Sequence, residues 1–212
     1  MGKDYEQFKI YAKLGIDLNL YKEAQMKRRL TSLRNKRGYR DFVSYFQALN
    51  QDDDLLKEFV DRITINVSEF FRNPKRWHVL QTKVLPYLTR EKKSLQIWSA
   101  ACSTGEEPYS LAMMLNTYFP QIQYQILATD IDQKALDKAK EAIYSEQDMK
   151  EVPPELKMKY FTQKYGLYYL DPSLKQNITF KQHNLLADHY PQQLDLIGCR
   201  NFLIYFTEDS KD

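Results

Sequence analysis

Two adjacent carboxylates, Glu106 and Glu107, stand where a buried strand changes into a helix. The stretch from Leu95 to Phe119 begins with a short apolar run of strand length and continues with apolar residues at helical spacing. A turn of small residues separates the two and ends in Gly105, which has no Cβ and lets a ligand approach the backbone closely. Ligands of α/β proteins bind outside the carboxyl ends of the strands. We therefore expect a small-molecule site at this turn.

The chemistry of the turn suits a cationic ligand group. Neither G-x-G-x-x-G nor G-x-x-x-x-G-K-[ST] occurs, and two acids at a helix start would repel the phosphate that those motifs bind. A free α-amino group is the kind of ligand end that Glu106 and Glu107 could hold. A second interpretation stays open, because Thr104 and Glu107 also have the spacing of a capping box.

A second strand, predicted over residues 124–129, ends in Asp130-Ile131-Asp132. An acid at the tip of the second strand of a doubly wound sheet commonly binds ribose hydroxyls, and Asp130 has nearly the expected spacing from the turn. The alternative role for an acid here is to cap the helix predicted over residues 133–143, and Asp132 fits that role better. The two acids can divide these tasks.

Composition places the chain among ordinary globular proteins. It has 212 residues, of which 43% are hydrophobic, and a net charge of +3, so it can build a core without being strongly basic. Cys102 and Cys199 lack the spacing of a disulfide framework or a zinc site, and the three histidines show no ligand pattern, so we expect no metal. No signal peptide or membrane-spanning run is present, which favours a cytoplasmic protein.

The periodicity predicts two domains. Residues 1–75 have helical spacing and form an all-helical domain, whereas residues 76–212 form an α/β domain with a doubly wound, Rossmann-like sheet. Pro153 and Pro154 introduce a less regular stretch, about residues 150–182, in which strands over 166–170 and 178–181 suggest a small antiparallel insertion.

A basic helix is predicted over residues 21–37, and Glu23 is its single acid. Its candidate docking residues share a long positive side chain: Arg28, Arg29, Arg34 and Arg37. One interpretation is a solvated helix face, and the other is a docking surface for an acidic partner, either nucleic acid or an acidic helical protein. The absence of intercalated aromatic residues weakens the case for nucleic acid.

A polar segment, I-N-V-S-E-F-F-R-N-P-K-R-W, joins the two predicted domains over residues 65–77. Pro74 disfavours helix at the preceding residue, and Arg72 offers a fork-shaped donor. The segment is either an interdomain linker or an elbow that contributes side chains to the site.

Five motifs, in the same order and spacing, resemble one family. They are N-V-S-E-F-F-R, A-A-C-S-T-G-E-E-P-Y-S, A-T-D-I-D, N-L-L and C-R-N-F-L-I-Y-F. The chain resembles the CheR-type glutamate O-methyltransferases of bacterial chemotaxis, which use S-adenosylmethionine, from about Tyr5 to its last residue. The resemblance implies methylation of glutamate carboxylates in the acidic methylation helices of chemoreceptors (methyl-accepting chemotaxis proteins), with S-adenosylhomocysteine as the product.

The resemblance also implies roles for individual positions. Three residues of the 65–77 segment would reach over the cofactor: Asn66, Ser68 and Arg72. Glu107 would hold the methionine amine, and Asp130 would bond the ribose. Four later residues would complete the site, with Asn184 and Leu185 flanking the adenine and Asn201 and Phe202 beneath the sulfonium. From the chemistry of methyl transfer, our own hypothesis is that Arg72 and Tyr205 orient the incoming carboxylate. The family usually has Thr at position 68, and Ser68 keeps the hydroxyl.

The partners follow from the same resemblance. The basic helix would dock on the receptor, with no nucleic-acid partner and no membrane insertion, and we expect a monomer. In the family the sheet continues after the I-Y-F motif, whereas this chain stops at Asp212, so either the chain is truncated or another element completes the sheet. Two alternatives remain: a nucleic-acid methyltransferase, although an N-P-P-Y-like motif is absent, and a non-catalytic module that binds S-adenosylmethionine and regulates a partner.

Overall fold

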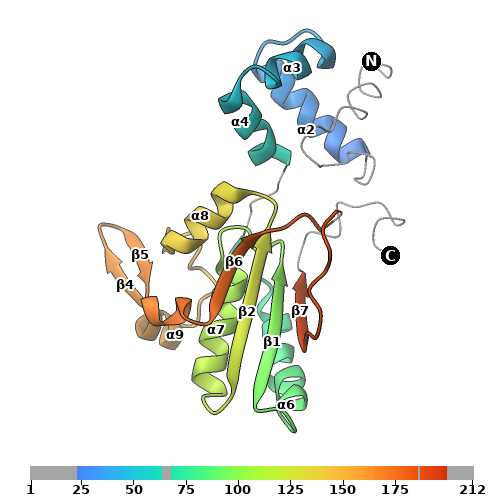
Figure 1. Cartoon of the computed structure of the whole chain (residues 1–212). Helices are drawn as coiled ribbons and strands as arrows, with labels where there is room; N and C mark the ends of the chain where they lie inside the picture. Colours follow the sequence, from blue (N-terminus) through green and yellow to red (C-terminus); the bar gives the residue numbers. More distant parts are fainter. Residues whose placement is uncertain (1–22, 64–67, 186, 200–212) are drawn as a thin grey trace. The chain divides into compact units, whose positions relative to one another are not determined.

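A computed structural model of the chain describes residues 23–63, 68–185 and 187–199 (Figure 1). Four of the predicted site residues lie outside these ranges: Asn66, Asn201, Phe202 and Tyr205. The described residues divide into a helical unit, up to residue 63 with the turn at 184–188, and a sheet unit, residues 68–183 and 189–199.

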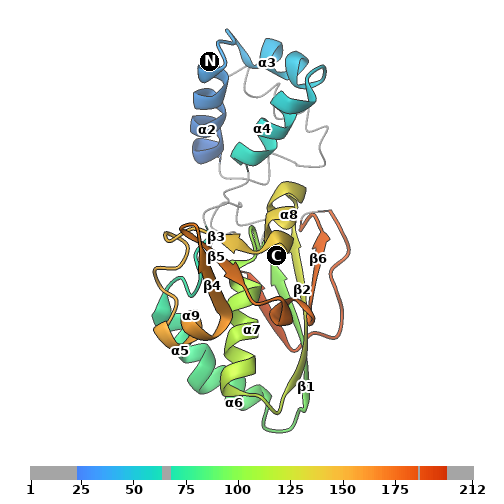
Figure 2. The same ribbon diagram turned by 90° about the vertical axis from the view of Figure 1, so that its left-hand side faces the viewer.

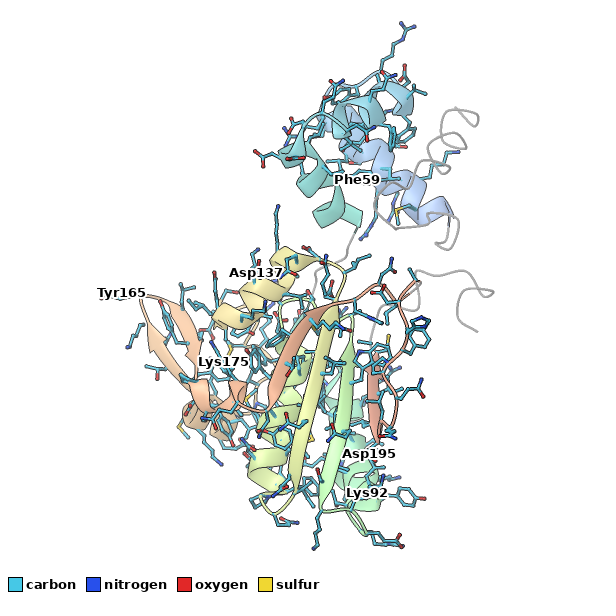
Figure 3. The ribbon with its side chains drawn as sticks, viewed as in Figure 1. Phe59, Lys92, Asp137, Tyr165, Lys175 and Asp195 are labelled. Atoms are coloured by element: carbon cyan, nitrogen blue, oxygen red, sulfur yellow. The ribbon has the colours of Figure 1, made fainter. Side chains whose placement is uncertain are left out.

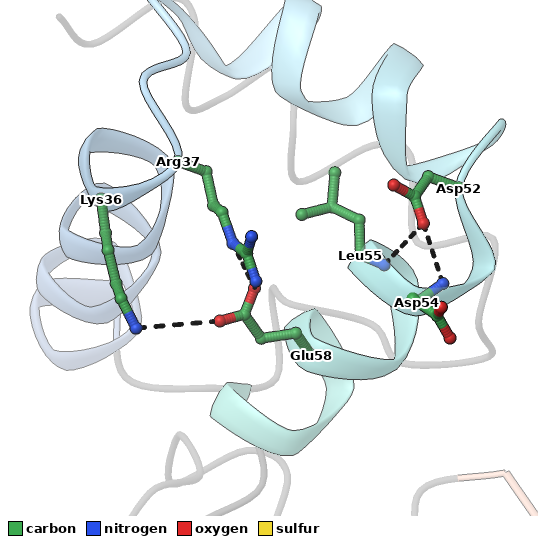
Figure 4. Close-up of polar contacts among 6 residues, drawn as sticks. All are labelled: Lys36, Arg37, Asp52, Asp54, Leu55 and Glu58. Carbon is green, nitrogen blue, oxygen red and sulfur yellow. Dashed lines mark hydrogen bonds and ion pairs between the residues drawn. The ribbon is translucent and has the colours of Figure 1, made fainter.

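The helical unit contains α2 (Glu23–Lys36), α3 (Phe42–Leu49) and α4 (Asp53–Ile63). Side-chain caps begin α3 and α4, because Asp41 accepts the Ser44 N–H at 2.7 Å and Asp52 accepts the Leu55 N–H at 2.9 Å (Figure 4). Apolar residues of the three helices are buried together: Met26, Leu30, Leu33, Phe42, Tyr45, Leu49, Leu55 and Phe59.

The main sheet of the second unit has four parallel strands in the order β6-β2-β1-β7 (Figure 1). They are β1 (Ser94–Ala100), β2 (Gln123–Asp130), β6 (Ile178–Gln182) and β7 (Leu196–Cys199). The chain runs outward from β1 to β2 and β6 and then returns to β7 on the other side of β1. The strand order therefore reverses between β1 and β7, where open α/β sheets bind ligands.

Helices flank this sheet, and their buried residues form a hydrophobic core together with those of the strands. α7 (Glu106–Tyr118) joins β1 to β2, and α8 (Gln133–Glu141) follows β2 (Figure 2). A continuous helical segment precedes β1 and is made of α5 (Pro74–Val79), the wide π turn η2 (Leu80–Val84) and α6 (Leu85–Leu88). Pro86, just beyond the π turn, has no N–H to donate, which accounts for the local change in hydrogen bonding.

The small antiparallel sheet is confirmed, with a different membership from the one predicted. It consists of β3 (Ile143–Tyr144), β4 (Phe161–Lys164) and β5 (Leu167–Leu170) in the order β3-β5-β4, with α9 (Pro154–Tyr160) before β4 and the 3-10 helix η3 (Pro172–Lys175) after β5. The prediction that residues 178–181 belong to it is wrong, because β6 pairs in parallel with β2. A short apolar alternation identifies a strand but carries no information about its partner.

The architecture thus confirms the predicted class, a helical domain followed by an α/β fold with a parallel sheet and a small antiparallel one. Among the helices that the structure describes, none combines the length and the apolar character that a membrane crossing requires.

An acidic residue fastens the start of β7 to β1. Asp195 Oδ2 accepts the Gln96 N–H at 2.7 Å, and the Asp195 N–H donates to the Gln96 carbonyl at 2.8 Å. Asp195 Oδ1 also forms an ion pair with Lys92, which precedes β1 (Figure 3). The hydrogen bonds from Lys92 and from the Gln96 N–H lower the pKa of Asp195.

We expect Asp195→Asn to lower the free energy of unfolding by up to about 1 kcal/mol at neutral pH, the range for an exposed ion pair. Because the pKa is lowered in the folded state, the wild-type contribution is present above the unfolded-state pKa of about 3.9 and is lost as the pH falls through the folded value. Urea denaturation at neutral pH and near pH 2 measures the difference. An equal difference at both pH values would contradict this assignment.

Candidate functional site

The turn between β1 and α7 has an uncommon backbone. Ala101, Ser103 and Gly105 have φ angles of 56°, 50° and 92°, so every second residue is left-handed. Non-glycine residues rarely adopt this conformation, and such strain concentrates at functional sites. A Cβ at position 105 would lie 2.9 Å from the Cβ of Ala139, so only glycine fits there.

Asp130, at the end of β2, holds this turn in place. Its Oδ2 accepts the Ser103 N–H at 2.8 Å, and its Oδ1 accepts the Asp132 N–H at 3.0 Å. Burial raises the pKa of Asp130, and the two backbone hydrogen bonds oppose that shift. Asp132 caps α8, because its Oδ1 accepts the Lys134 N–H at 2.9 Å. The cap role predicted for Asp132 is therefore confirmed. The ribose contact of Asp130 stays a prediction.

Glu107 lies at the point where the strand order reverses. Its Oε1 accepts the Ser99 hydroxyl at 2.9 Å, and Ser99 pairs with Gly198 across β1 and β7. A Cβ at position 198 would come within 2.5 Å of the same oxygen, so the missing side chain makes room for the carboxylate. The capping-box interpretation is wrong, because the N-cap of α7 is Gly105, without a side-chain cap.

Glu107 borders a cavity of about 250 Å³. Residues from α5, η2, α7 and β7 line it: Arg76, Trp77, Leu80, Glu107, Leu111, Leu196, Ile197, Gly198 and Cys199. Apart from Arg76 and Glu107 the lining is mostly apolar. Such a cavity accommodates a ligand with an apolar body and a cationic group for the carboxylate.

Glu106 has a different environment from its neighbour Glu107. It is 2% exposed, and Thr104 donates its hydroxyl to Oε1 at 2.6 Å. Burial raises the pKa of Glu106, while the hydroxyl groups of Thr104 and Ser68 lower it. Oε2 has no hydrogen-bond partner within the described part of the chain. Successive residues of a helix point about 100° apart. The adjacent positions of the two acids in the sequence therefore already indicate that only one of them can face the cavity.

The segment at residues 68–73, which we call the elbow, is packed into the sheet unit. Phe70 is fully buried and Phe71 is 4% exposed, so the elbow contributes to the core and does more than link two domains. Arg72 is half-buried, and the Trp77 indole N–H donates to the Arg72 carbonyl at 3.1 Å. Because Trp77 also lines the cavity beside Glu107, the elbow and the cavity meet at this residue.

The two cysteines are unsuited to act as nucleophiles. Burial raises the pKa of Cys102, and the charges of Asp130, Glu107 and Glu106 raise it further. Burial, with a contribution from Glu107, raises the pKa of Cys199 to about 11. Both thiols therefore stay protonated at neutral pH. Over the described ranges, no group of three or more potential metal ligands occurs.

Two predicted adenine contacts lie in a short turn that groups with the helical unit. In this turn the Asn184 N–H donates to Asp188 Oδ2 at 2.8 Å, and the Asn184 carbonyl accepts the Ala187 N–H at 3.1 Å. The roles of Asn184 and Leu185 toward a nucleoside stay predictions.

Comparison with known proteins shows matches along the whole chain. Residues 66–212 match the family model described as CheR methyltransferase, SAM binding domain, and residues 3–64 match CheR methyltransferase, all-alpha domain. A chemotaxis protein methyltransferase of Listeria monocytogenes is 46% identical over 100% of this chain and 82% of its own length. Proteins of the same name are 36% identical in Borreliella burgdorferi (96% and 77% covered) and 32% identical in Escherichia coli (95% and 73%).

We expect Asp130→Asn to lower the free energy of unfolding by about 1–3 kcal/mol, the cost of a buried N–H without an acceptor. An asparagine has a single side-chain carbonyl oxygen, whereas Asp130 accepts from two backbone N–H groups. Chemical denaturation measures the change. Asp137→Asn, on the exposed side of α8 (Figure 3), is the matched control and should stay within about 0.5 kcal/mol of wild type. Equal stability of the two variants would contradict the anchoring role of Asp130.

Proposed function

The chain belongs to the CheR methyltransferase family, and on this premise we propose that it methylates glutamate side chains in the methylation helices of bacterial chemoreceptors. Membership and the names of the relatives establish an S-adenosylmethionine-dependent methyltransferase of chemotaxis. The glutamate acceptor, the receptor partner and the individual site residues are the proposal. The observation that carries it is the Glu107 carboxylate beside a largely apolar cavity, at the reversal of strand order.

The donor groups at the turn fit S-adenosylmethionine. Glu107 would hold its α-amino group, and Asp130, at the end of the adjacent strand, would accept from its ribose hydroxyls through lone pairs that the two backbone N–H groups leave available. The elbow residues Ser68 and Arg72 would close over the cofactor together with Asn66. When bound, the cofactor supplies an electrophilic methyl group on a positively charged sulfonium.

The acceptor needs orientation more than activation. A glutamate with a pKa of about 4.3 is already ionised at neutral pH, so the reaction requires no general base. Correct orientation of reactants can lower a barrier by roughly 7–11 kcal/mol. Arg72 would aim the incoming carboxylate with its guanidinium fork, and Tyr205, outside the described residues, would help through its hydroxyl. Neither residue would need to move a proton.

The arginines of the basic helix differ in their contacts within the helical unit. Arg37 forms an ion pair with Glu58 at 2.6 Å (Figure 4), and Arg34 lies over the Phe42 ring at 4.7 Å and bonds the Asn35 side chain. Arg28 is exposed. We therefore assign Arg37 and Arg34 partly to the fold of the unit and the exposed Arg28 to receptor docking, and Arg29 keeps its predicted docking role.

The proposed function is tested by the binding of S-adenosylhomocysteine to Glu107→Gln. The glutamine keeps the shape and the hydrogen bond to Ser99 but loses the charge, so affinity measured by calorimetry should fall about 10- to 100-fold. Glu151→Gln, at an exposed position, is the control and should bind like wild type. Undiminished affinity of Glu107→Gln would remove Glu107 from the site. If the wild-type protein transfers no methyl group from labelled cofactor to any receptor fragment, the proposed function is wrong.

For docking, we expect the double charge reversal Arg28→Glu and Arg29→Glu to raise the KM for a receptor fragment about tenfold at low salt. The effect should shrink near ~1 M salt, where the Debye length is about 3 Å. Steady-state kinetics at the two salt concentrations measure it, with Lys83→Glu, an exposed residue of η2, as the control. If the charge reversal leaves the KM unchanged at low salt, the basic helix has no docking role and is a solvated helix face.

A further inference from the structure

Arg72 lies between two residues with left-handed backbones. Phe71 has a φ of 51° and Asn73 a φ of 59°. Asparagine tolerates this conformation, but a bulky aromatic residue rarely adopts it. A conformation of this kind persists only where surrounding contacts determine it, and it tends to occur where a side chain must be aimed. The contacts that fix Phe71 therefore decide where Arg72 points.

One of these contacts comes from α7. The Phe71 N–H donates to Ser110 Oγ at 3.2 Å, and Ser110 Oγ donates in turn to the Glu106 carbonyl at 2.7 Å. Ser110 is fully buried, so no solvent molecule can replace its oxygen without a rearrangement. The second bond orients the hydroxyl hydrogen away from Phe71, which leaves a lone pair for the backbone donor.

The other side of Arg72 is fixed from α5. The Trp77 indole N–H donates to the Arg72 carbonyl at 3.1 Å, and the Phe71 and Trp77 rings meet edge to face at 5.2 Å between centroids. Besides the hydrogen bond from the Arg72 N–H to the Glu69 carbonyl at 3.4 Å, the backbone around Arg72 is held by the Ser110 oxygen before it and the Trp77 indole after it. Both come from helices that contribute to the cavity beside Glu107.

Phe70 anchors the start of the elbow. Its ring packs edge to face against Tyr144 at 4.7 Å and Phe161 at 5.3 Å, and its N–H donates to the Asp148 carbonyl at 3.2 Å. These contacts hold the start of the segment in the core, whereas the N–H of the left-handed Phe71 is bonded by Ser110. Ser110 is therefore the residue whose removal would loosen the aim of Arg72 while Phe70 stays in place.

We propose that Ser110 is a positioning residue for methyl transfer, because it holds the Phe71 N–H and thereby aims the Arg72 guanidinium at the acceptor carboxylate. This role rests on the proposed function and deepens it, since Ser110 lies 39 residues from Phe71 and belongs to none of the predicted cofactor contacts. Its hydroxyl acts through the elbow backbone and touches neither reactant.

The test combines amide exchange with a double-mutant cycle. In Ser110→Ala the Phe71 amide should exchange with solvent at least about tenfold faster, measured by hydrogen exchange over residues 68–73. Turnover should fall about tenfold, while affinity for S-adenosylhomocysteine, to which Arg72 also contributes, should fall by a clearly smaller factor. Because Ser110 acts through Arg72, adding Ser110→Ala to Arg72→Ala should lower turnover no further.

Two variants serve as controls. Thr117→Val removes a hydroxyl from the same helix that bonds Tyr160 at 2.9 Å, away from the elbow, and should leave exchange at 68–73 and turnover unchanged. Ser110→Thr retains the hydroxyl and should restore both quantities toward wild type. If Ser110→Ala fails to fold, Ser110→Cys, of similar shape but with a weaker acceptor, should show the same changes at smaller size.

Each result bears on the proposal. Unchanged exchange in a folded Ser110→Ala protein would overturn the contact between Ser110 and the elbow. Multiplicative losses in the double variant would show that Ser110 does not act through Arg72. Failure of the wild type to methylate a receptor fragment would overturn the proposed function and the positioning role with it, whereas faster exchange would still establish Ser110 as the elbow contact.

Discussion

The arrangement of the sheet unit depends on one buried carboxylate that accepts backbone N–H groups from a left-handed turn. Asp130 bonds Ser103 at the centre of the turn, so the chain leaving β1 can reverse its direction and begin α7 at Glu106. That starting point places Glu107 over the Ser99–Gly198 pair. Were α7 to begin one residue later, the carboxylate would rotate by about 100° and leave the cavity. The position of the acid is thus a consequence of the turn.

Glu106 and Glu107, adjacent acids at the start of α7, have different surroundings. Glu106 is buried against hydroxyl groups and the elbow, whereas Glu107 faces a cavity. Together with Asp130, and in addition to burial, they raise the pKa of Cys102, because their negative charges disfavour a thiolate. A region with this surplus of negative charge disfavours phosphate and favours an amine, which agrees with a sulfonium cofactor that carries a free α-amino group.

Local patterns predicted much of this molecule. Spacing and turn chemistry alone predict the strand, turn and helix at residues 95–119, the cap at Asp132 and one strand of the antiparallel insertion, at residues 167–170. The partner of residues 178–182 could not be predicted, because a parallel neighbour is chosen by the path of the chain and leaves no mark on a five-residue strand. Ser110 was missed for a similar reason: a serine inside a helix carries no sign of an acceptor role toward a backbone N–H 39 residues away.

The tryptophans are intrinsic fluorescent probes of the site. The chain has 2 of them, and each stands at one edge of the functional region. Trp77 bonds the Arg72 carbonyl, whereas Trp98 donates to the Thr129 hydroxyl at 2.9 Å, next to the strand end that carries Asp130. Intrinsic fluorescence therefore monitors the elbow and the strand end that carries Asp130 without an attached dye. Replacing either indole by phenylalanine would separate the two signals and reveal the order in which the two edges respond to a ligand.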